Sequence, residues 1–593
     1  MIARTRALEL VSWVTALAAC SGGSSSAERD VQDEGTAQDV PGDDGATQDV
    51  PQDDGPAQDV QRDGADLVLV GGVVRTMDEA LPLATAVVVH DGRITYVGDD
   101  EGARSQIGVG TEVVELDGRA VIPGLIDAHN HLLWSGTELL DVDLYAATTV
   151  AELLAPVVER AESQPEGWIR GAGWEPPAFE GLLHREQLDE AVPGRLVFLS
   201  SADAHSAFVS SAALEAAEID ASTPDPAGGI IERDRDGVPT GILRETAADL
   251  VAALLPDYPE AQVDQGLDDA LAEATGMGIT TIVDPYVEAW MLQGYIRRDQ
   301  AGTLGMRVFG AVYVDPVDAL DYIAEAVDLR DRYQSEHVHV NAVKLFIDGV
   351  IESETALLLE PYEDGTNAEA LFTDDALHEA IAAADAAGLQ LHAHAIGDGA
   401  VRQMLDAVDW LAGANGERDR RPLLAHLELI DPADIPRFAA LGAYANVQPL
   451  WAHPDEYIQE LTWPVIGEER SQWLYPIGAL YEAGATVVAG SDWSVSSMDV
   501  FDAIEVAVTR RDPEDPEGLE LTPAQRVTTE QILRAHTIDG ARAVFLEDDI
   551  GSITVGKWAD LVIVDRDPLA VDAADLSDIE VDATYFEGTL VDR

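Results

Sequence analysis

The sequence has very little positive charge. Of its 593 residues, 35 are Lys or Arg and 111 are Asp or Glu, which gives a formal net charge of −76. Such a surface repels phosphate backbones, so nucleic acid is excluded as a partner, and adhesion to an anionic lipid surface needs an anchor. Only Lys344 and Lys557 are lysines. Because the chain uses Arg wherever charge alone matters, a remaining lysine can serve chemistry that Arg cannot perform.

Cysteine is almost absent as well. Cys20 is the only one, so no disulfide can form within the chain. The apolar run 10–19 before it is about half as long as a membrane-spanning helix. Two arginines precede this run and LAAC ends it, which is typical of an export signal over residues 1–20. LAAC resembles the lipobox of bacterial lipoproteins, which implies lipidation of Cys20 and an exported protein anchored to a membrane, on the periplasmic face or the cell surface. A plain secreted protein is the alternative, since Glu9 adjoins the run.

Residues 21–64 are poor in apolar side chains. They repeat the unit AQDVPGDDG, TQDVPQDDG, AQDVQRDG. Such an acidic segment has almost nothing to bury and repels itself, so we expect a disordered, extended tether. Cation binding by the Asp-Asp-Gly repeats is an alternative, although they lack the ligand pattern of a calcium loop.

The two ends of the remaining chain resemble each other in pattern. Residues 65–122 and 547–593 consist of short alternating apolar runs separated by turns. They predict one small composite β-sandwich built from both ends. Lys557 lies in a Gly-Lys turn of the second part, so we interpret it as structural.

The centre, residues 123–546, alternates apolar runs with Ala-rich amphipathic helices. This order predicts an α/β fold, a (β/α)8 TIM-like barrel. Residues 140–245 exceed what a barrel needs and predict an inserted subdomain over its mouth. We expect the eight strands at 124–128, 279–284, 307–313, 341–348, 389–395, 422–428, 443–449 and 486–492.

The first of these strands leads into VIPGLIDAHNH, residues 121–131. Alternate side chains of a strand share a face, so Asp127, His129 and His131 should point the same way, and the two imidazoles can hold one metal between them. A bare His-x-His is weak evidence, since two polar residues at a strand end have the same spacing.

Other strand ends supply partners for these histidines. Because catalytic groups of such barrels lie at the C-terminal ends of the strands, these side chains should meet. Imidazole and carboxylate ligands suit zinc first, with manganese or iron as alternatives. The set comprises His129 and His131, Lys344 on the fourth strand, His394 on the fifth, His426 on the sixth and Asp492 on the eighth.

With these residues in place the sequence resembles the metal-dependent amidohydrolase superfamily, and within it the family 3 amidohydrolases that include N-substituted formamide deformylases. The motifs PGLIDAHNH, VKLFIDGVIES, HAHAIGD, AHLE, GSDWSV and GKWADLVIVD carry the resemblance over about residues 66–593. It implies one or two divalent metal ions. His129, His131 and Asp492 would hold the first ion, and His394 and His426 the second. Lys344, carboxylated by carbon dioxide, would bridge them.

The interpretation of Lys344 has an alternative. It can be a buried counter-ion to Asp348, and the site would then hold one metal. The resemblance implies hydrolysis of an amide-like carbon–nitrogen bond in a small molecule, with Asp492 taking the proton of the attacking water and giving it to the leaving nitrogen. Other possibilities are a lactone, ester or cyclic imide hydrolase, and a non-catalytic surface binding lipoprotein. The intact ligand set argues against the last.

Several further residues are candidates for supporting roles. His392 lies one layer deeper than His394, which favours a hydrogen-bonding role over coordination. Asp127 and Asp398 can orient ligand imidazoles or cap turns. His205 and Trp174 in the insert, and Trp451 and His453, can shape a substrate pocket, although aromatic residues often simply pack. The segment around His205 departs from the family at Ala204 and Ser210. We also expect that an exposed barrel flank can support a homodimer.

Overall fold

The computed structural model describes residues 64–174, 179, 181–201, 206–226, 229–352 and 354–592. The predicted export signal, Cys20, the tether up to residue 63 and His205 lie outside the described residues. No helix among the described residues is both long enough and apolar enough to span a membrane.

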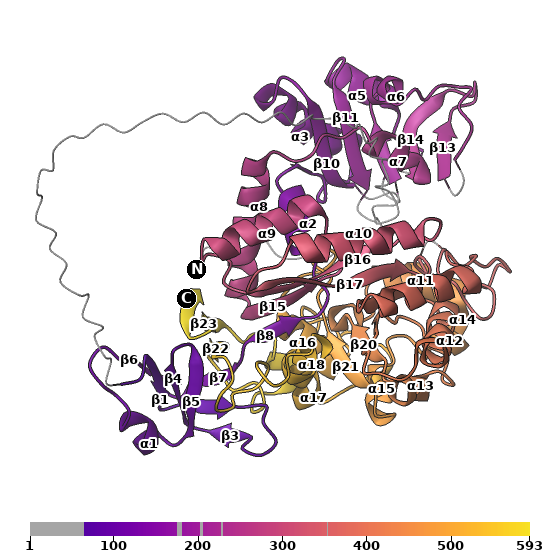
Figure 1. Ribbon diagram of the computed structural model, residues 1–593. Helices are drawn as coiled ribbons and strands as arrows, with labels where there is room; N and C mark the ends of the chain where they lie inside the picture. Colours follow the sequence, from indigo (N-terminus) through magenta and orange to yellow (C-terminus); the bar gives the residue numbers. More distant parts are fainter. Residues whose placement is uncertain are drawn as a thin grey trace, which may run out of the picture.

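Eight parallel strands form one sheet in the centre of the molecule (Figure 1), and the predicted barrel is confirmed. Each neighbouring pair is parallel, and the spatial order follows the chain order. Each predicted run coincides with or overlaps one strand, and β17 begins three residues before the predicted run 341–348. They are β8 (Leu125–Asp127), β15 (Ile279–Asp284), β16 (Arg307–Tyr313), β17 (Val338–Phe346), β18 (Gln390–Ala395), β19 (Leu423–His426), β20 (Tyr444–Val447) and β21 (Thr486–Ala489).

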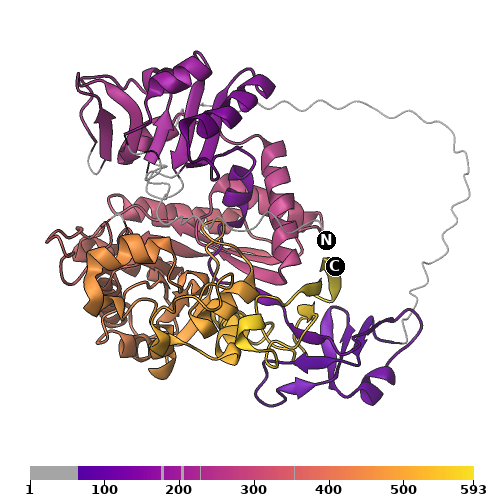
Figure 2. The same ribbon diagram turned by 180° about the vertical axis from the view of Figure 1, so that it is seen from behind.

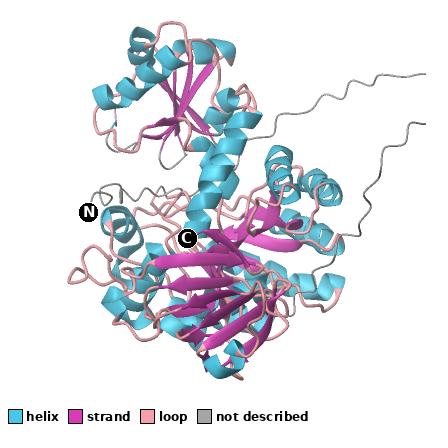
Figure 3. Cartoon of the chain, turned by 90° about the vertical axis from the view of Figure 1, so that its left-hand side faces the viewer, coloured by secondary structure: helices cyan, strands magenta, loops and turns pink. Residues whose placement is uncertain are grey.

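Helices alternate with these strands and pack against the sheet (Figure 3). Helix α11 shows why they form. The side chain of Thr373 caps its first turn, and Leu377, Ala380, Ile381 and Ala384 are buried at the spacing of one helical face. The major barrel helices are α8 (Glu260–Gly276), α9 (Ala289–Gln300), α10 (Ala319–Arg332), α11 (Asp374–Ala386), α12 (Asp398–Asn415), α13 (Ile435–Leu441), α15 (Ile477–Glu482) and α16 (Val500–Thr509).

The first and last strands, β8 and β21, close the barrel through the residues that follow them. The amide of Ala128 donates to the carbonyl of Ala489 at 2.9 Å, which begins the contact. Gly490 continues it, and a Cβ at this position would lie 2.5 Å from the backbone nitrogen of His129. Only glycine allows the two segments to approach this closely. The seam therefore brings the motifs around residues 129 and 492 together.

The two ends of the described chain build a small β domain, visible beside the barrel in Figures 1 and 2. In one of its sheets, β22 (Leu561–Val564) of the C-terminal part pairs with β7 (Ala120–Pro123) of the N-terminal part. A second sheet has the order β5-β4-β1-β6, and both parts supply a shared apolar core. Its remaining strands are β1 (Leu67–Val70), β2 (Val73–Arg75), β3 (Leu83–Ala84), β4 (Ala86–His90), β5 (Arg93–Gly98), β6 (Glu112–Glu115), β23 (Val581–Phe586) and β24 (Thr589–Asp592). The composite β domain of the predicted fold is thus present.

Between α2 (Leu132–Glu138) and α8, the chain forms a separate α/β unit, shown at the top of Figure 1. Its mixed sheet has the order β13-β14-β12-β11-β10-β9, and it has apolar clusters of its own. Trp174 belongs to one of these clusters and donates its indole N–H to the carbonyl of Leu199 at 2.9 Å. In the structure Trp174 packs within this unit, as the alternative to a pocket role describes. The unit contains β9 (Val142–Asp143), α3 (Val150–Ser163), β10 (Trp168–Trp174), α5 (Arg185–Ala191), β11 (Leu196–Ser201), β12 (Ser206–Val209), α6 (Ser211–Ala216), β13 (Gly229–Arg233), β14 (Pro239–Glu245) and α7 (Thr246–Ala252).

Candidate metal centre

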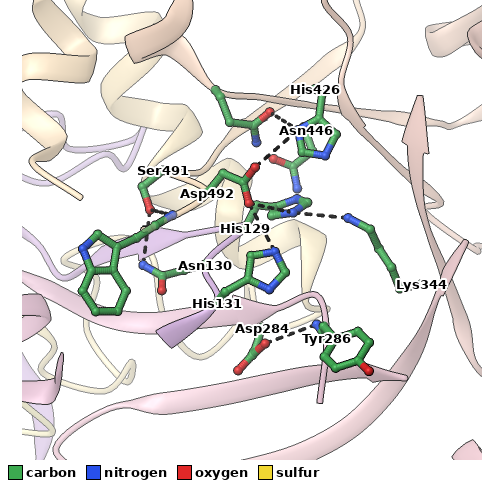
Figure 4. A network of polar contacts seen from close by, with 12 residues as sticks. His129, Asn130, His131, Asp284, Tyr286, Lys344, His426, Asn446, Ser491 and Asp492 are labelled. Carbon is green, nitrogen blue, oxygen red and sulfur yellow. Dashed lines mark hydrogen bonds and ion pairs between the residues drawn. The ribbon is translucent and has the colours of Figure 1, made fainter. Parts of the chain in front are cut away.

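His129, His131 and Asp492 meet at the seam of the barrel (Figure 4). The Nε2 atoms of both imidazoles lie 3.3 Å from Oδ1 of Asp492. All three side chains are buried. The amide of Asp492 donates to the carbonyl of His129 at 2.7 Å, and that of His131 to the carbonyl of Trp493 at 3.0 Å. Backbone hydrogen bonds thus hold residues that follow the first and the last barrel strand in one cluster.

The three side chains fit a bound metal ion. Donor atoms at about 2.0–2.1 Å from a tetrahedral ion lie about 3.3–3.4 Å apart, which agrees with the spacing of these atoms. Oδ1 of Asp492 is buried without a hydrogen-bond partner among the described residues, and a cation would satisfy it. Burial lowers the pKa of His131 and places that of His129 well below its usual value. Both imidazoles are therefore neutral and can each offer a lone pair.

His392 orients the first of these imidazoles. Its Nε2 lies 3.0 Å from Nδ1 of His129 and its side chain is fully buried. When the Nδ1–H of His129 donates in this contact, the Nε2 lone pair of His129 faces Asp492. This is the geometry of a residue that fixes the tautomer of a ligand without coordinating the metal itself.

Gln448 orients the imidazole of His426 in the same way as His392 orients that of His129. The sequence motifs do not single out Gln448. Its Oε1 lies 3.0 Å from Nδ1 of His426, so the imidazole donates there and its Nε2 remains free. Gln448 directly follows β20, and its position at a strand end is the one signal in the sequence that could have identified it. His426 (φ +76°) and Asp492 (φ +57°) both adopt the left-handed backbone conformation, which is found at functional sites when surrounding structure enforces it.

His394 lies beside His426, with ring centroids 4.5 Å apart, and the ring of His426 is 4.8 Å from that of His129. Nε2 of His394 is 3.1 Å from the carbonyl of Gly349 and 3.8 Å from Oδ1 of Asp348. An Nε2–H that donates to this carbonyl leaves Nδ1 as the ligand atom. A second pair of imidazoles therefore adjoins the first.

Lys344 is 1% exposed and its Nζ lies 3.3 Å from Nε2 of His129. Burial lowers the pKa of its amine to about 7, although the carboxylate of Asp492 opposes this shift. Asp348 accepts hydrogen bonds from the backbone amides of Leu357, Ile396 and Gly397. The alternative in which Lys344 is a counter-ion to Asp348 thus loses its support, because the amine contacts the ligand cluster instead.

Among the described residues, the carboxylates of Asp127 and Asp398 accept from groups other than ligand imidazoles, and Asp127 caps a turn by accepting from the amide of His129 at 3.2 Å. The carboxylate of Asp127 accepts from the amide and the hydroxyl of Ser491 at 2.9 and 2.6 Å, and from the amide side chain of Asn130 at 2.9 Å. Asp398 accepts from the amide of Leu359 at 2.8 Å. Strand β8 ends at Asp127. Through its bonds to Ser491, the Asp127 side chain connects the two segments that form the barrel seam.

A pocket that is open to solvent lies among the segments that follow β17 to β21. We call it the mouth pocket. Trp451 in its wall stacks on the imidazole of His426 at a centroid distance of 5.5 Å and donates its N–H to Ser496 at 3.0 Å. His453 is buried just after Trp451, and its Nδ1 has no hydrogen-bond partner among the described residues. The mouth pocket therefore shares a wall with the candidate ligands.

Comparisons with known proteins agree with this geometry. Residues 112–592 match the model of the amidohydrolase family. Protein LONG AFTER FAR-RED 3 of Arabidopsis thaliana is 33% identical over 88% of this chain and 91% of its own length. The N-substituted formamide deformylase of Arthrobacter pascens is 30% identical over 88% of this chain and 98% of its own.

Among solved structures, an uncharacterized metal-dependent hydrolase from Pyrococcus furiosus superposes with a TM-score of 0.69 at 27% identity. The alignment covers 85% of this chain and 99% of that one. The family model spans the barrel, its seam and part of the composite β domain, and it includes every residue of the histidine and aspartate cluster. The chain therefore belongs to the amidohydrolase family of metal-dependent hydrolases.

Proposed function

We propose that this protein hydrolyses a non-peptide amide or formamide-like carbon–nitrogen bond of a small molecule. The observation that carries the proposal is the spacing of 3.3 Å between Oδ1 of Asp492 and each of the two imidazole Nε2 atoms, which suits a metal site that also positions a proton acceptor. The resemblance to a formamide deformylase over nearly the whole of both chains supports the bond type.

In this proposal His129, His131 and Asp492 hold one ion, with zinc as the first choice for imidazole and carboxylate ligands. His394 and His426 hold a second. Nδ1 of His129 contacts His392 and Nδ1 of His426 contacts Gln448, which leaves Nε2 of both imidazoles for a metal. When bound, the metal lowers the pKa of a coordinated water and polarises the substrate carbonyl.

Lys344, whose amine lies 3.3 Å from Nε2 of His129, would contribute a further anionic ligand as a carbamate. With its pKa lowered to about 7, a large part of the lysine is neutral amine at physiological pH. This amine attacks carbon dioxide, forms an N–C bond and releases one proton, which leaves a negatively charged carbamate in a cluster of neutral imidazoles. Arg cannot react in this way because it stays protonated.

Asp492 acts on protons. Its carboxylate accepts the proton of the attacking water and delivers it to the nitrogen that leaves, so that an amide and one water become a carboxylic acid and an amine. Two imidazoles lie at Oδ1, while Nδ1 of His426 lies 3.8 Å from Oδ2. The proton is therefore exchanged inside the cluster, away from bulk water.

Metal content per chain tests the proposal. Protein produced with bicarbonate and zinc should contain two ions, and Lys344→Ala should contain one or none while its circular dichroism stays unchanged. One ion in both proteins would mean a mononuclear hydrolase in which Lys344 has no bridging role. No metal in either, together with no hydrolysis of an amide and formamide library, would overturn the proposal.

We also propose that the protein is exported and anchored through a lipid on Cys20. The support is the LAAC motif after the short apolar run. Labelled fatty acid should be incorporated into the wild-type protein in bacterial cells and should be absent from Cys20→Ser, which should leave the membrane fraction. Equal membrane retention of both would contradict the anchor.

A further inference from the structure

The mouth pocket carries three carboxylates in its wall. Glu352 follows β17, Glu428 follows β19, and Asp455 lies in the segment after β20. No Lys or Arg belongs to the described lining of this pocket. Carboxylates from three separate segments therefore face one concave space that lies beside the candidate metal ligands.

The carboxylate of Asp455 accepts from the amide of Ile458 at 2.8 Å, whereas Glu428 has few hydrogen-bond donors among the described residues. The hydroxyl of Thr462 lies 3.3 Å from Glu352 and 3.4 Å from Glu428, yet one hydroxyl has one proton to donate. Glu428 is 2% exposed, and the Thr462 hydroxyl is the one donor to its carboxylate among the described residues. Glu352 and Asp455 share this wall with Glu428, and like charges that face one concave space repel each other. A positive group in the pocket would remove this electrostatic cost.

The rest of the lining favours an organic cation over a metal ion. Trp451, Tyr457 and Tyr475 contribute aromatic side chains, whose faces attract ammonium groups, and several aliphatic residues complete the wall. The three carboxylates are not among the described groups whose ligand atoms all lie within 4.8 Å of one another. They are too far apart for one small ion but suit a wider group such as an alkylammonium.

The mouth pocket is also within reach of the reacting bond. Glu428 lies two residues after His426, and Val495 in the same wall lies three residues after Asp492. Trp451 joins the two sites directly, since one face of its ring stacks on His426. A cation held here would thus belong to the same substrate molecule whose carbonyl lies at the metal centre.

We propose that the mouth pocket binds a positively charged amine of the substrate, so that the preferred substrates are amides or formamides that carry a second, cationic amine. This substrate class rests on the proposed function. Glu428 and Glu352 neutralise the charge, and Trp451, Tyr457 and Tyr475 surround its alkyl part. Neutral amides of the same length lack this attraction to the carboxylates and should bind more weakly.

Binding of tetramethylammonium to the metal-loaded protein tests the pocket without any turnover. This cation has no lone pair and cannot coordinate the metal, and tert-butanol is a neutral molecule of similar shape. By calorimetry we expect tetramethylammonium to bind at least ten-fold more tightly than tert-butanol. Glu428→Gln should weaken the binding of tetramethylammonium at least ten-fold and leave the binding of tert-butanol unchanged. The matched control, Glu460→Gln, removes an exposed charge nearby and should change neither.

Hydrolysis of a matched pair then tests the substrate class. N-(4-aminobutyl)formamide should have a kcat/KM at least ten-fold above that of N-pentylformamide, and Glu428→Gln should reduce this ratio to about one. Circular dichroism, the melting temperature and the metal content show whether the variant is folded.

The two proposals fail in different ways. Equal binding of tetramethylammonium and tert-butanol, or equal behaviour of Glu428→Gln and Glu460→Gln, would overturn the cation pocket while leaving hydrolysis intact. Absence of hydrolysis for every amide, with cation binding that depends on Glu428, would overturn the proposed function and leave the pocket. Tight binding of Ca²⁺ that displaces tetramethylammonium and is lost in Glu428→Gln would replace the organic cation by a metal ion.

Discussion

Two groups of histidine and aspartate among the described residues bring their ligand atoms within 4.8 Å of one another. One is His129, His131 and Asp492 in the barrel. The other is Asp66, His90 and Asp91 in the small β domain, which we call the surface group. In the first, the exposed fractions of the side chains are 0, 7 and 4%, whereas in the second those of His90 and Asp91 are 42 and 89%.

The two groups have similar chemistry but differ in how their surroundings hold them. In the surface group, Asp66 lies 3.4 Å from Nδ1 of His90 and accepts from the amide of Asp91 at 2.6 Å, and water reaches the outer atoms. Water competes with a metal for such donors, and the exposed Asp91 side chain would lose freedom on binding. The barrel group is already desolvated and fixed by backbone hydrogen bonds across the seam. Preorganisation, more than ligand type, should therefore separate the two.

Removal of the metal should have the largest effect. His131→Ala deletes one donor of the barrel group, and we expect loss of most of the bound metal and of nearly all turnover, as a chelator would cause in the wild type. Added zinc should restore the chelated wild type but not the variant. Elemental analysis and turnover provide the measurements. A variant with normal metal content would show that the barrel group does not bind the metal.

Asp492→Asn should come next, with kcat lowered about 10³-fold, because the amide keeps the shape of the side chain but cannot accept the water's proton. We expect KM to change much less than kcat, which separates loss of proton transfer from loss of substrate binding. Steady-state kinetics across pH give this separation. Turnover within two-fold of the wild type would exclude Asp492 as the proton acceptor.

Gln448→Leu tests the preorganisation that distinguishes the barrel group. Without its contact to Nδ1, His426 can rotate or change tautomer, and we expect about 10–100-fold weaker metal binding. Metal competition with a chromophoric chelator measures this. Gln448→Glu should recover part of the affinity, since a carboxylate also accepts from Nδ1–H. Equal affinity in the wild type and Gln448→Leu would mean that packing alone orients the imidazole.

His90→Ala should have the smallest effect. The surface group is hydrated, so removal of its imidazole should leave the metal content and kcat within two-fold of the wild type and change the free energy of unfolding by at most about 0.5 kcal/mol. Chemical denaturation and elemental analysis check both values. A drop of one ion per chain in His90→Ala would reverse the comparison and make the surface group a real metal site.

Much of the barrel could be predicted from the sequence. Its strands are buried apolar runs such as ITTIVD of β15, whose side chains are buried throughout, and the polar residues that end these runs meet because parallel strands share one C-terminal edge. This local pattern is sufficient to predict that Lys344, His394 and His426 lie near His129. At Asp127 the contacts follow the turn-capping alternative, since its carboxylate accepts from the amide of His129 at 3.2 Å.

The sequence by itself determined the strand pattern, the types of ligand and the composition of a strongly acidic chain, since these depend on neighbouring residues alone. The tertiary structure decided which atoms of those ligands face one another. The contact of Gln448 with His426, the fastening of the seam by Asp127 and the convergence of Glu352, Glu428 and Asp455 on one pocket each join side chains on separate segments. Side-chain direction depends on packing and on hydrogen bonds to distant parts of the chain, and a linear pattern contains neither.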